Sequence, residues 1–233
     1  MRRRAAARDA QAGDLRGVRV SLWRPDLLRA QLRAILRVQP RGQCKIMVPM
    51  VASAEELLAV RRMIDEARAE LGYAEPVEVG VMIETPAAAV TADLIAAHAD
   101  FLSIGTNDLA QYALAMDRGN SHLAAQVDGL HPAVLRLIAQ TVDGARKHGR
   151  WVGLCGALAS DFVAAPILIG LGVSELSVTP QVAPEMKALI RTLRLGACRA
   201  LAAQALAQTS AGAVRELRLS AGPGLQPRIE GMR

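Results

Sequence analysis

The sequence predicts an α/β fold, an incomplete TIM-type (β/α) barrel with about five of the eight parallel strands that such a barrel contains. Short apolar runs of strand length alternate with helical patterns along most of the chain, which is typical of a parallel sheet. Each run is almost continuously apolar, as expected of strands covered on both faces. With 233 residues, the chain is long enough for most of one barrel, which typically takes about 250.

The chain begins with a segment that is not expected to join the sheet. Residues 1–14 carry several arginines and no consistent apolar face, so we expect a disordered lead-in. The next stretch, 15–22, alternates small apolar residues with arginine and is predicted to be extended. Pro25 suits a first helical turn, and it begins a helix with an apolar stripe of Leu28, Leu32 and Ile35.

Five strands and their connecting helices follow. The strands are predicted at residues 45–50, 77–84, 101–108, 151–156 and 175–179. Helices are predicted at 53–71, from 86, and at 132–148, 161–171, 184–193 and 196–207. Ser53 and Glu56 have the spacing of a capping box, and Pro166 is expected to kink or divide its helix. We predict a barrel domain at 15–210 and a flexible tail at 211–233.

Composition and charge argue against several classes of protein. The chain is 52% hydrophobic but only 3% aromatic, so its core consists mainly of small aliphatic side chains. The net charge is +6, yet the arginines are scattered and have little aromatic interleaving, which argues against nucleic-acid binding. The three cysteines lack CxxC spacing, so neither disulfides nor zinc is indicated. Without a long apolar run or an apolar signal segment, we expect a cytoplasmic protein with no membrane insertion.

Polar side chains follow the predicted strands. Ligands of parallel α/β proteins collect at the carboxyl ends of the strands, where Glu84, Asn107, Asp108 and Cys155 are expected. Glu84 and Asp108 would project to one face, and carboxylate oxygens suit Mg²⁺ or Mn²⁺ rather than a soft metal. This predicts a magnesium site shared with an anionic substrate. A plainer interpretation is that Asn107 and Asp108 cap a helix, as both residue types commonly do.

The remaining candidates also have two interpretations. Cys155 would stand at the rim of the same pocket, where a nearby cation favours the thiolate and permits proton exchange. A free cysteine is, however, more often a small buried hydrophobe. Arg118 and Arg16 have guanidinium groups suited to clamping a phosphate or carboxylate. The neighbouring Asn-Asp pair supports this role for Arg118, whereas the position of Arg16 fits a surface residue equally well. No histidine has a triad partner or ligand spacing.

The chain resembles a known family in three motifs. They are GVMIETPAAA at 80–89, SIGTNDLAQYALAMDRGN at 103–120 and GLCGALASD at 153–161. Their order and spacing closely resemble the C-terminal phosphoenolpyruvate (PEP) binding barrel of PEP-protein phosphotransferase, Enzyme I of the bacterial sugar phosphotransferase system. The resemblance covers about residues 15–195, and the run from TNDLAQY to DRGN is highly specific. Residues 188–206 are similar to the tail of the fused multiphosphoryl transfer proteins.

This resemblance implies a role for each candidate residue. Glu84 and Asp108 would bind Mg²⁺, and Asn107 with Asp108 would contact the substrate phosphate. Arg16 and Arg118 would bind the anion. Cys155 would protonate C3 of the enolate as pyruvate forms. The implied partners are PEP and pyruvate, a phosphohistidine-bearing domain, the phosphocarrier protein HPr and a second copy in a homodimer.

The chain also departs from the family pattern. Many members have Glu directly after Cys-Gly, whereas this chain has Ala157, so the help of that carboxylate is missing. The family's first three strands, with further arginines, and its phosphohistidine motif are not in the sequence. We therefore expect a fragment with an incomplete ring of ligands. Because an open barrel exposes strand edges, we expect the isolated chain to be marginally stable or to aggregate.

Two other functions remain open from the sequence. A metal-dependent aldolase or lyase of the related pyruvate-enolate barrels also places a Glu and an Asp on a metal, although the DRGN and Cys-Gly motifs favour the phosphotransferase. The third possibility is a module that binds PEP without turnover, or an inactive fragment.

Overall fold

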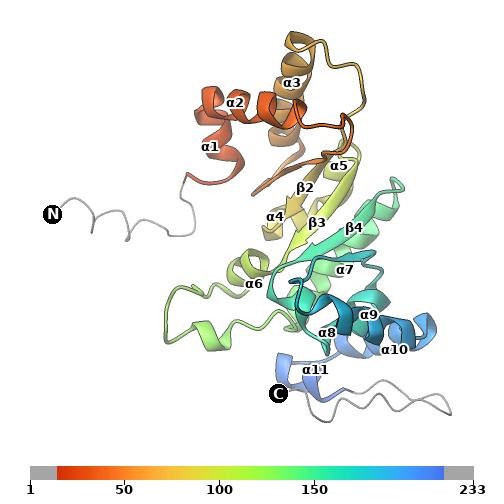
Figure 1. Cartoon of the computed structure of the whole chain (residues 1–233). Helices are drawn as coiled ribbons and strands as arrows, with labels where there is room; N and C mark the ends of the chain where they lie inside the picture. Colours follow the sequence, from red (N-terminus) through yellow and green to blue (C-terminus); the bar gives the residue numbers. More distant parts are fainter. Residues whose placement is uncertain (1–14, 218–233) are drawn as a thin grey trace.

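One five-stranded parallel sheet forms the centre of the molecule in a computed structural model that describes residues 15–217 (Figure 1). Its order is β1-β2-β3-β4-β5, so each strand pairs with its neighbour in the sequence. The strands are β1 Ile46–Val48, β2 Val79–Ile83, β3 Phe101–Gly105, β4 Trp151–Cys155 and β5 Glu175–Leu176. The predicted α/β class and the positions of the strands are confirmed. Each strand is shorter than predicted, and β3 ends before Asn107 and Asp108.

Helices connect consecutive strands, because parallel neighbours need a crossover connection between them. They are α3 Ala54–Glu70, α4 Pro86–Val90, α5 Ala92–Ala96, α6 Thr106–Leu114, α7 Pro132–Arg146 and α8 Ala164–Leu171, with 3₁₀ turns η1 Ala124–Gln126 and η2 Ala157–Ser160. Two further helices, α9 Ala183–Thr192 and α10 Leu195–Leu206, follow β5. The sequence sets several ends locally. Pro86 occupies the first turn of α4, and the Thr85 hydroxyl caps that helix by accepting from the N–H of Ala88. Gly149 follows α7 with φ +65°, a conformation that suits glycine.

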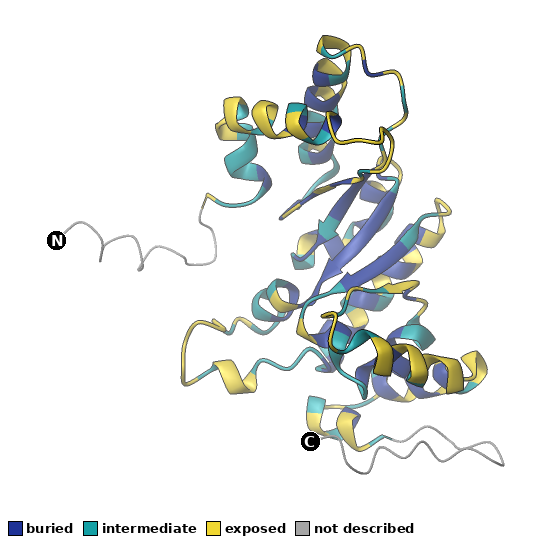
Figure 2. Cartoon of the chain, in the orientation of Figure 1, coloured by how far each residue is buried: buried dark blue, intermediate teal, exposed yellow. Residues whose placement is uncertain are grey.

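The two faces of the sheet have different surroundings. In one row of paired residues, Val48, Val81, Leu102 and Val152 are all buried in the main hydrophobic core. The opposite face begins with a row of Met47, Gly80, Phe101 and Trp151, in which the two aromatic rings stack at 4.8 Å. Met47 is 40% exposed there. Figure 2 shows the strands mainly buried and the outer surfaces of α2 and α9 exposed.

The segment predicted to be extended at 15–22 is helical instead. Helix α1 covers Val18–Trp23 and is followed by α2, Pro25–Leu36. The alternation of valine and arginine resembles a strand, but the chain turns at Gly17, whose φ is +57°. A Cβ at this position would lie 2.4 Å from Cβ of Met50, so the backbone approaches the segment that follows β1 too closely for another residue. This close approach is a tertiary effect that the local pattern does not contain.

Three local predictions need correction. Ser53 precedes α3, but its side chain makes no capping bond, and Glu56 accepts from the N–H of Ala52. Helix α8 begins at Ala164 and runs unbroken, because Pro166 lies in its first turn, where no helical N–H bond is required. Part of the predicted flexible tail forms α11, Ala211–Glu216. The predicted lead-in 1–14 and residues 218–233 lie outside the described residues. None of the helices within 15–217 is long and apolar enough to cross a membrane.

Candidate functional site

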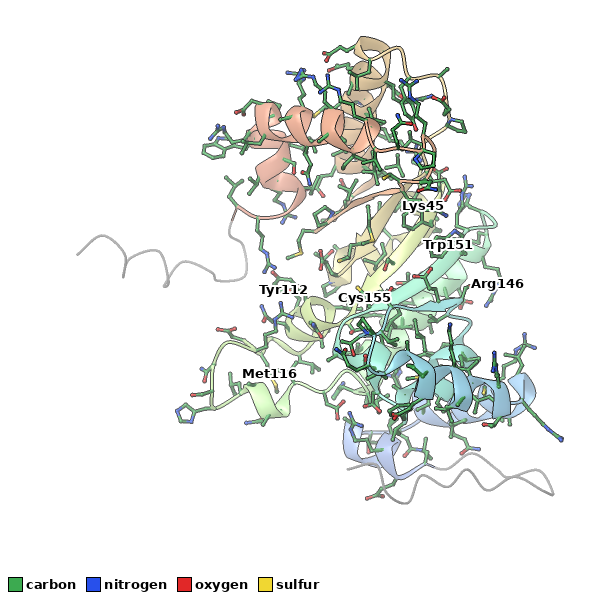
Figure 3. All side chains as sticks on the ribbon, in the orientation of Figure 1. Lys45, Tyr112, Met116, Arg146, Trp151 and Cys155 are labelled. Atoms are coloured by element: carbon green, nitrogen blue, oxygen red, sulfur yellow. The ribbon has the colours of Figure 1, made fainter. Side chains whose placement is uncertain are left out.

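The candidate residues lie at the carboxyl edge of three neighbouring strands. Glu84 directly follows β2, α6 starts directly after β3, and Cys155 is the last residue of β4. Figure 3 shows Cys155 and Tyr112 at this end of the strands and Lys45 and Trp151 at the other end. This is the edge at which parallel sheets bind their ligands.

Glu84 is a buried carboxylate in a tightly shaped position. It is 5% exposed, and its Oε1 accepts a hydrogen bond of 2.8 Å from the N–H of Met50. A Cβ at Gly105 would lie 2.9 Å from its Oε2, so glycine at the end of β3 makes room for this carboxylate. Burial raises the pKa of Glu84, the bond from Met50 opposes this, and the charge of Asp108 raises it further. The two carboxylates are therefore within electrostatic reach of each other.

Asp108 brings two arginines together. It lies in the first turn of α6 and its side chain is only 13% exposed. Nη2 of Arg118 lies 3.3 Å from both of its oxygens, and Nη2 of Arg16 lies 3.4 Å from Oδ1. Nη1 of Arg16 also donates to the hydroxyl of Tyr112. Arg16 therefore reaches the site instead of lying on a remote surface, and the carboxylate of Asp108 contacts arginines instead of capping the helix.

Asn107 links the ends of β3 and β4. Its Oδ1 accepts from the N–H of Ala157 at 3.0 Å, and the hydroxyl of Thr106 donates to the carbonyl of Cys155 at 2.8 Å. Between them lies Gly156 with φ +89°, where a Cβ would come within 2.6 Å of Oγ1 of Thr106. The Cys-Gly motif thus allows α6 to lie directly against the end of β4.

Cys155 carries a protonated thiol at neutral pH. Its side chain is half-buried, and Sγ lies 3.5 Å from the carbonyl oxygen of Ile104, to which it donates. Burial raises the pKa of this thiol, a hydrogen bond with Ser103 opposes that, and the negative charge of Glu84 raises it further. The protonated form is the one that a proton donor needs.

The carboxylates suit a cation that a substrate helps to hold. Within 15–217 no group of three or more His, Cys, Asp or Glu residues is placed to hold a metal ion. Mg²⁺ is usually bound by one or two carboxylates together with waters and substrate phosphates. Glu84 and Asp108 supply such a pair, and a cation would offset the burial and the charge of Asp108 that raise the pKa of Glu84. The donor set therefore fits Mg²⁺ or Mn²⁺ with an anionic substrate.

A pocket of about 370 Å³ adjoins the site. Asn107 and Arg118 line it, and so do Asp128, Asp161 and Arg215. These last three residues were not among the candidates predicted from the sequence, and neither were Thr106 and Tyr112. Tyr112 lies one helical turn after Asp108, a spacing that identifies neighbours on a helix. No signal in the sequence points to Arg215.

The comparisons with known proteins agree with one another on the kind of protein that the chain resembles. The family described as PEP-utilising enzyme, PEP-binding domain, matches residues 13–195. Multiphosphoryl transfer proteins of Xanthomonas campestris and Rhodobacter capsulatus are 54% and 53% identical to the chain, each over 87% of it. A PEP-protein phosphotransferase of Haemophilus influenzae is 41% identical over 87% of the chain. The chain spans 24% of each multiphosphoryl transfer protein and 36% of the Haemophilus protein.

A solved structure resembles the fold. A crystal structure of a citrate lyase from Burkholderia xenovorans matches with a TM-score of 0.55 and 23% sequence identity. The match covers 77% of this chain and 58% of that chain. At this identity the likeness concerns the fold alone.

Proposed function

The chain belongs to the PEP-utilising enzymes, as their PEP-binding domain, and from this premise we propose that its site binds PEP for phosphoryl transfer to a protein histidine. The observation that carries this proposal is the convergence of Arg16 and Arg118 on Asp108, beside the buried Glu84. Relatives that are named PEP-protein phosphotransferase support the reaction type.

The arginines would bind the two anionic ends of the substrate. A guanidinium group matches carboxylate and phosphate geometry, and PEP carries one of each. Arg16 and Arg118 each have 42% of the side chain exposed, so a ligand can reach both. The Asn107 side chain, which its contact with Ala157 orients, would contact the phosphate from the other side.

Mg²⁺ or Mn²⁺ would be held by Glu84 and Asp108. When bound there, the ion would supply positive charge beside the transferring phosphoryl group, whose transition state needs positioning more than covalent help. The guanidinium groups of Arg16 and Arg118 would also neutralise charge on this phosphoryl group. Because Asp108 contacts both guanidinium groups, substrate binding would redistribute these contacts.

The reaction has two steps, the transfer of the phosphoryl group and the protonation of the enolate. The phosphorus–oxygen bond of PEP breaks, and a phosphorus–nitrogen bond forms with the acceptor histidine. The enolate of pyruvate then takes the proton of Sγ of Cys155 at C3, and water returns a proton to the thiolate. The raised pKa of Cys155 keeps its thiol protonated before this step. Ala157 has no carboxylate to assist the exchange, so we expect reprotonation to rely on solvent.

The acceptor is proposed to be a phosphohistidine-bearing domain that passes the group to the phosphocarrier protein HPr. This would give the chain its place in cytoplasmic sugar phosphotransfer, as part of a homodimer. The chain spans 24% of the Xanthomonas relative and 36% of the Haemophilus relative. Both relatives are therefore long enough to contain further domains.

Calorimetric titration of the 233-residue chain with PEP and Mg²⁺ tests the proposal. Saturable binding that requires the divalent ion is expected. Adding a separately supplied phosphoacceptor domain and measuring pyruvate then separates transfer from binding alone. Absence of PEP binding with either metal would overturn the proposal, and retro-aldol cleavage of a 2-keto-4-hydroxy acid would select the lyase alternative.

A further inference from the structure

Arg215 links two loops that are far apart in the sequence. It lies in α11, near the C-terminal end of the described chain (Figure 1). Its Nε and Nη2 donate to the two carboxylate oxygens of Asp128 at 2.7 and 2.9 Å, and Nη1 donates to Oδ2 of Asp161 at 2.9 Å. One guanidinium group therefore holds two carboxylates, one of them bidentately, which is the stronger geometry for such pairs.

Both carboxylates also organise their own segments. Oδ1 of Asp128 accepts from the N–H of Leu130, where the loop after α6 meets the start of α7. Oδ1 of Asp161 accepts from Val163 at the start of α8. Each acid thus fixes a turn with one oxygen and contacts Arg215 with the other or with both.

These two segments carry residues of the candidate site. The segment between α6 and α7, which includes Asp128, also contains Arg118, which contacts Asp108. The 3₁₀ turn that ends before Asp161 begins at Ala157, whose N–H holds the side chain of Asn107. Restraining Asp128 and Asp161 to each other therefore restrains the supports of Arg118 and Asn107.

The same five residues line one cavity. Asn107, Arg118, Asp128, Asp161 and Arg215 all belong to the wall of the pocket described above. Burial alone would raise the pKa of Asp128, but the hydrogen bonds from Arg215 and from Leu130 outweigh it and lower this pKa. The pair is thus fully charged at neutral pH and only partly exposed, with 40% of the Arg215 and 25% of the Asp128 side chain accessible.

We infer that Arg215 is a positioning residue, which holds the Asp128 loop and the η2 turn together and so keeps Arg118 and Asn107 aligned for an anionic substrate. The inference rests on the proposed function for the identity of that substrate. Arg215 acts through its two aspartates and does not touch the reacting atoms. A helix from the C-terminal end of the chain thereby contributes to the geometry of a site built on the preceding strands.

The test compares three variants of the full chain. Arg215→Met removes the charge but keeps an unbranched apolar stem, and Arg215→Lys keeps a charge that cannot hold two carboxylates in the same way. Arg61→Met is the matched control, because Arg61 pairs with Asp100 at 2.7 Å and with the carbonyl of His98, before β3 at the opposite end of the sheet. Calorimetry with PEP and Mg²⁺ gives the Kd, and amide hydrogen exchange follows residues 115–130 and 156–163.

We expect Arg215→Met to weaken PEP binding by about fivefold or more, as couplings within one network commonly do. Exchange should accelerate in both segments, and Arg215→Lys should recover part of both effects. Arg61→Met should leave the Kd within about twofold, because Arg61 lies far from the site and, within the described residues, shares no partner with it. The inference is overturned if Arg215→Met binds as the parent chain does, or if both methionine variants weaken binding equally.

The test of Arg215 can be read even if the proposed function is wrong. If the unchanged chain binds no PEP, the proposed function fails, and hydrogen exchange alone then decides the role of Arg215. Faster exchange in both segments for Arg215→Met but not for Arg61→Met would retain the positioning role. Unchanged exchange in either segment would overturn it.

Discussion

The hydroxyl of Thr106 donates a hydrogen bond of 2.8 Å to the backbone carbonyl of Cys155, and so ties the end of β3 to the end of β4. Thr106 is 2% exposed, which shields this bond from water. Asn107 provides a second link through the N–H of Ala157 at 3.0 Å. Together the two bonds determine how α6 leaves the sheet, and therefore where Asp108 lies.

Replacing Thr106 with Val should therefore misplace the site as well as destabilise the fold. Valine keeps the shape but leaves the partly buried carbonyl of Cys155 without this donor, a loss of about 1–3 kcal/mol in the free energy of unfolding. We expect weaker PEP binding in the presence of Mg²⁺, measured by calorimetry, and a lower midpoint of urea unfolding. Thr106→Ser retains the hydroxyl and is the control. Equal losses in both variants would contradict this role of the hydroxyl.

Gly156→Ala tests the close approach of α6 to β4. At Gly156 the φ of +89° disfavours alanine, and the new Cβ would lie 2.6 Å from Oγ1 of Thr106 and 2.9 Å from Oδ1 of Asn107. Gly149→Ala is the matched control, because Gly149 also has positive φ, +65°, but a Cβ there would meet open space, with nothing within 4 Å. We expect a loss of about 1–2 kcal/mol at Gly149 from the backbone alone.

The loss at Gly156 should be larger, about 2–4 kcal/mol, because overpacking adds to the backbone cost. It should also weaken PEP binding, whereas Gly149→Ala should not. Urea unfolding gives the stabilities and calorimetry the binding. If the two variants lose equal stability, the contact with Thr106 and Asn107 does not constrain the site.

The strands were predictable because their apolar runs are nearly continuous and both faces of most of them are buried. The end of β3 was placed three residues late, because Thr106, Asn107 and Asp108 are polar residues that suit a strand end and a first helical turn alike. Helix α1 was missed because the turn at Gly17 depends on its packing against Met50, which local periodicity does not record.

The residues of the candidate site also divide into those that local patterns predict and those that only tertiary contacts bring in. Glu84, Asp108 and Cys155 could be placed at one edge because the carboxyl ends of parallel strands always share an edge. Arg16 could not be distinguished from a surface arginine by spacing, since its contact with Asp108 spans 92 residues. Nothing in the local sequence indicates Arg215, because its partners lie 87 and 54 residues away and each carboxylate resembles an ordinary turn residue in its own segment.

The thiol of Cys155 should resist alkylation at neutral pH. Burial raises its pKa above the ordinary thiol value, so the reactive thiolate becomes abundant only at higher pH. We expect the iodoacetamide rate at the Cys155 peptide, followed by mass spectrometry, to rise at a pH above that of a free cysteine. Glu84→Gln should move this rise to lower pH, because the charge of Glu84 contributes to the shift. A rapid reaction at pH 7 would contradict the protonated state.

The edges of the sheet should make the isolated chain associate. Within the described residues, β1 and β5 are the edge strands, and an edge presents backbone groups that can pair with another chain. Met47 in β1 is 40% exposed, so Met47→Lys should reduce association in sedimentation experiments across a range of concentrations. Leu94→Lys, on α5 with 61% exposure, is the control and should have a smaller effect. A monomer at all concentrations, with a sharp and reversible thermal transition, would argue against this prediction.

Glu84 should make stability and binding change in opposite directions. Burial raises its pKa in the folded chain above the value in the unfolded chain. The folded state therefore takes up the proton more readily, and this contribution to stability, complete below the unfolded pKa, is lost as pH rises through the folded pKa. Above its folded pKa, Glu84 gives the folded chain without ligand a buried charge that a cation is suited to neutralise.

Glu84→Gln removes that charge while keeping an oxygen to accept the N–H of Met50. We expect a higher Tm near neutral pH and a flatter dependence of Tm on pH, because the titrating group is gone. Binding of PEP with Mg²⁺ should weaken by about tenfold or more, since the variant loses a charged ligand of the proposed cation. Glu56→Gln is the control, because Glu56 also accepts a backbone N–H, from Ala52 at 2.7 Å, but lies outside the site. A lower Tm for Glu84→Gln at neutral pH, together with unchanged binding, would mean that Glu84 stabilises the fold and does not serve a cation.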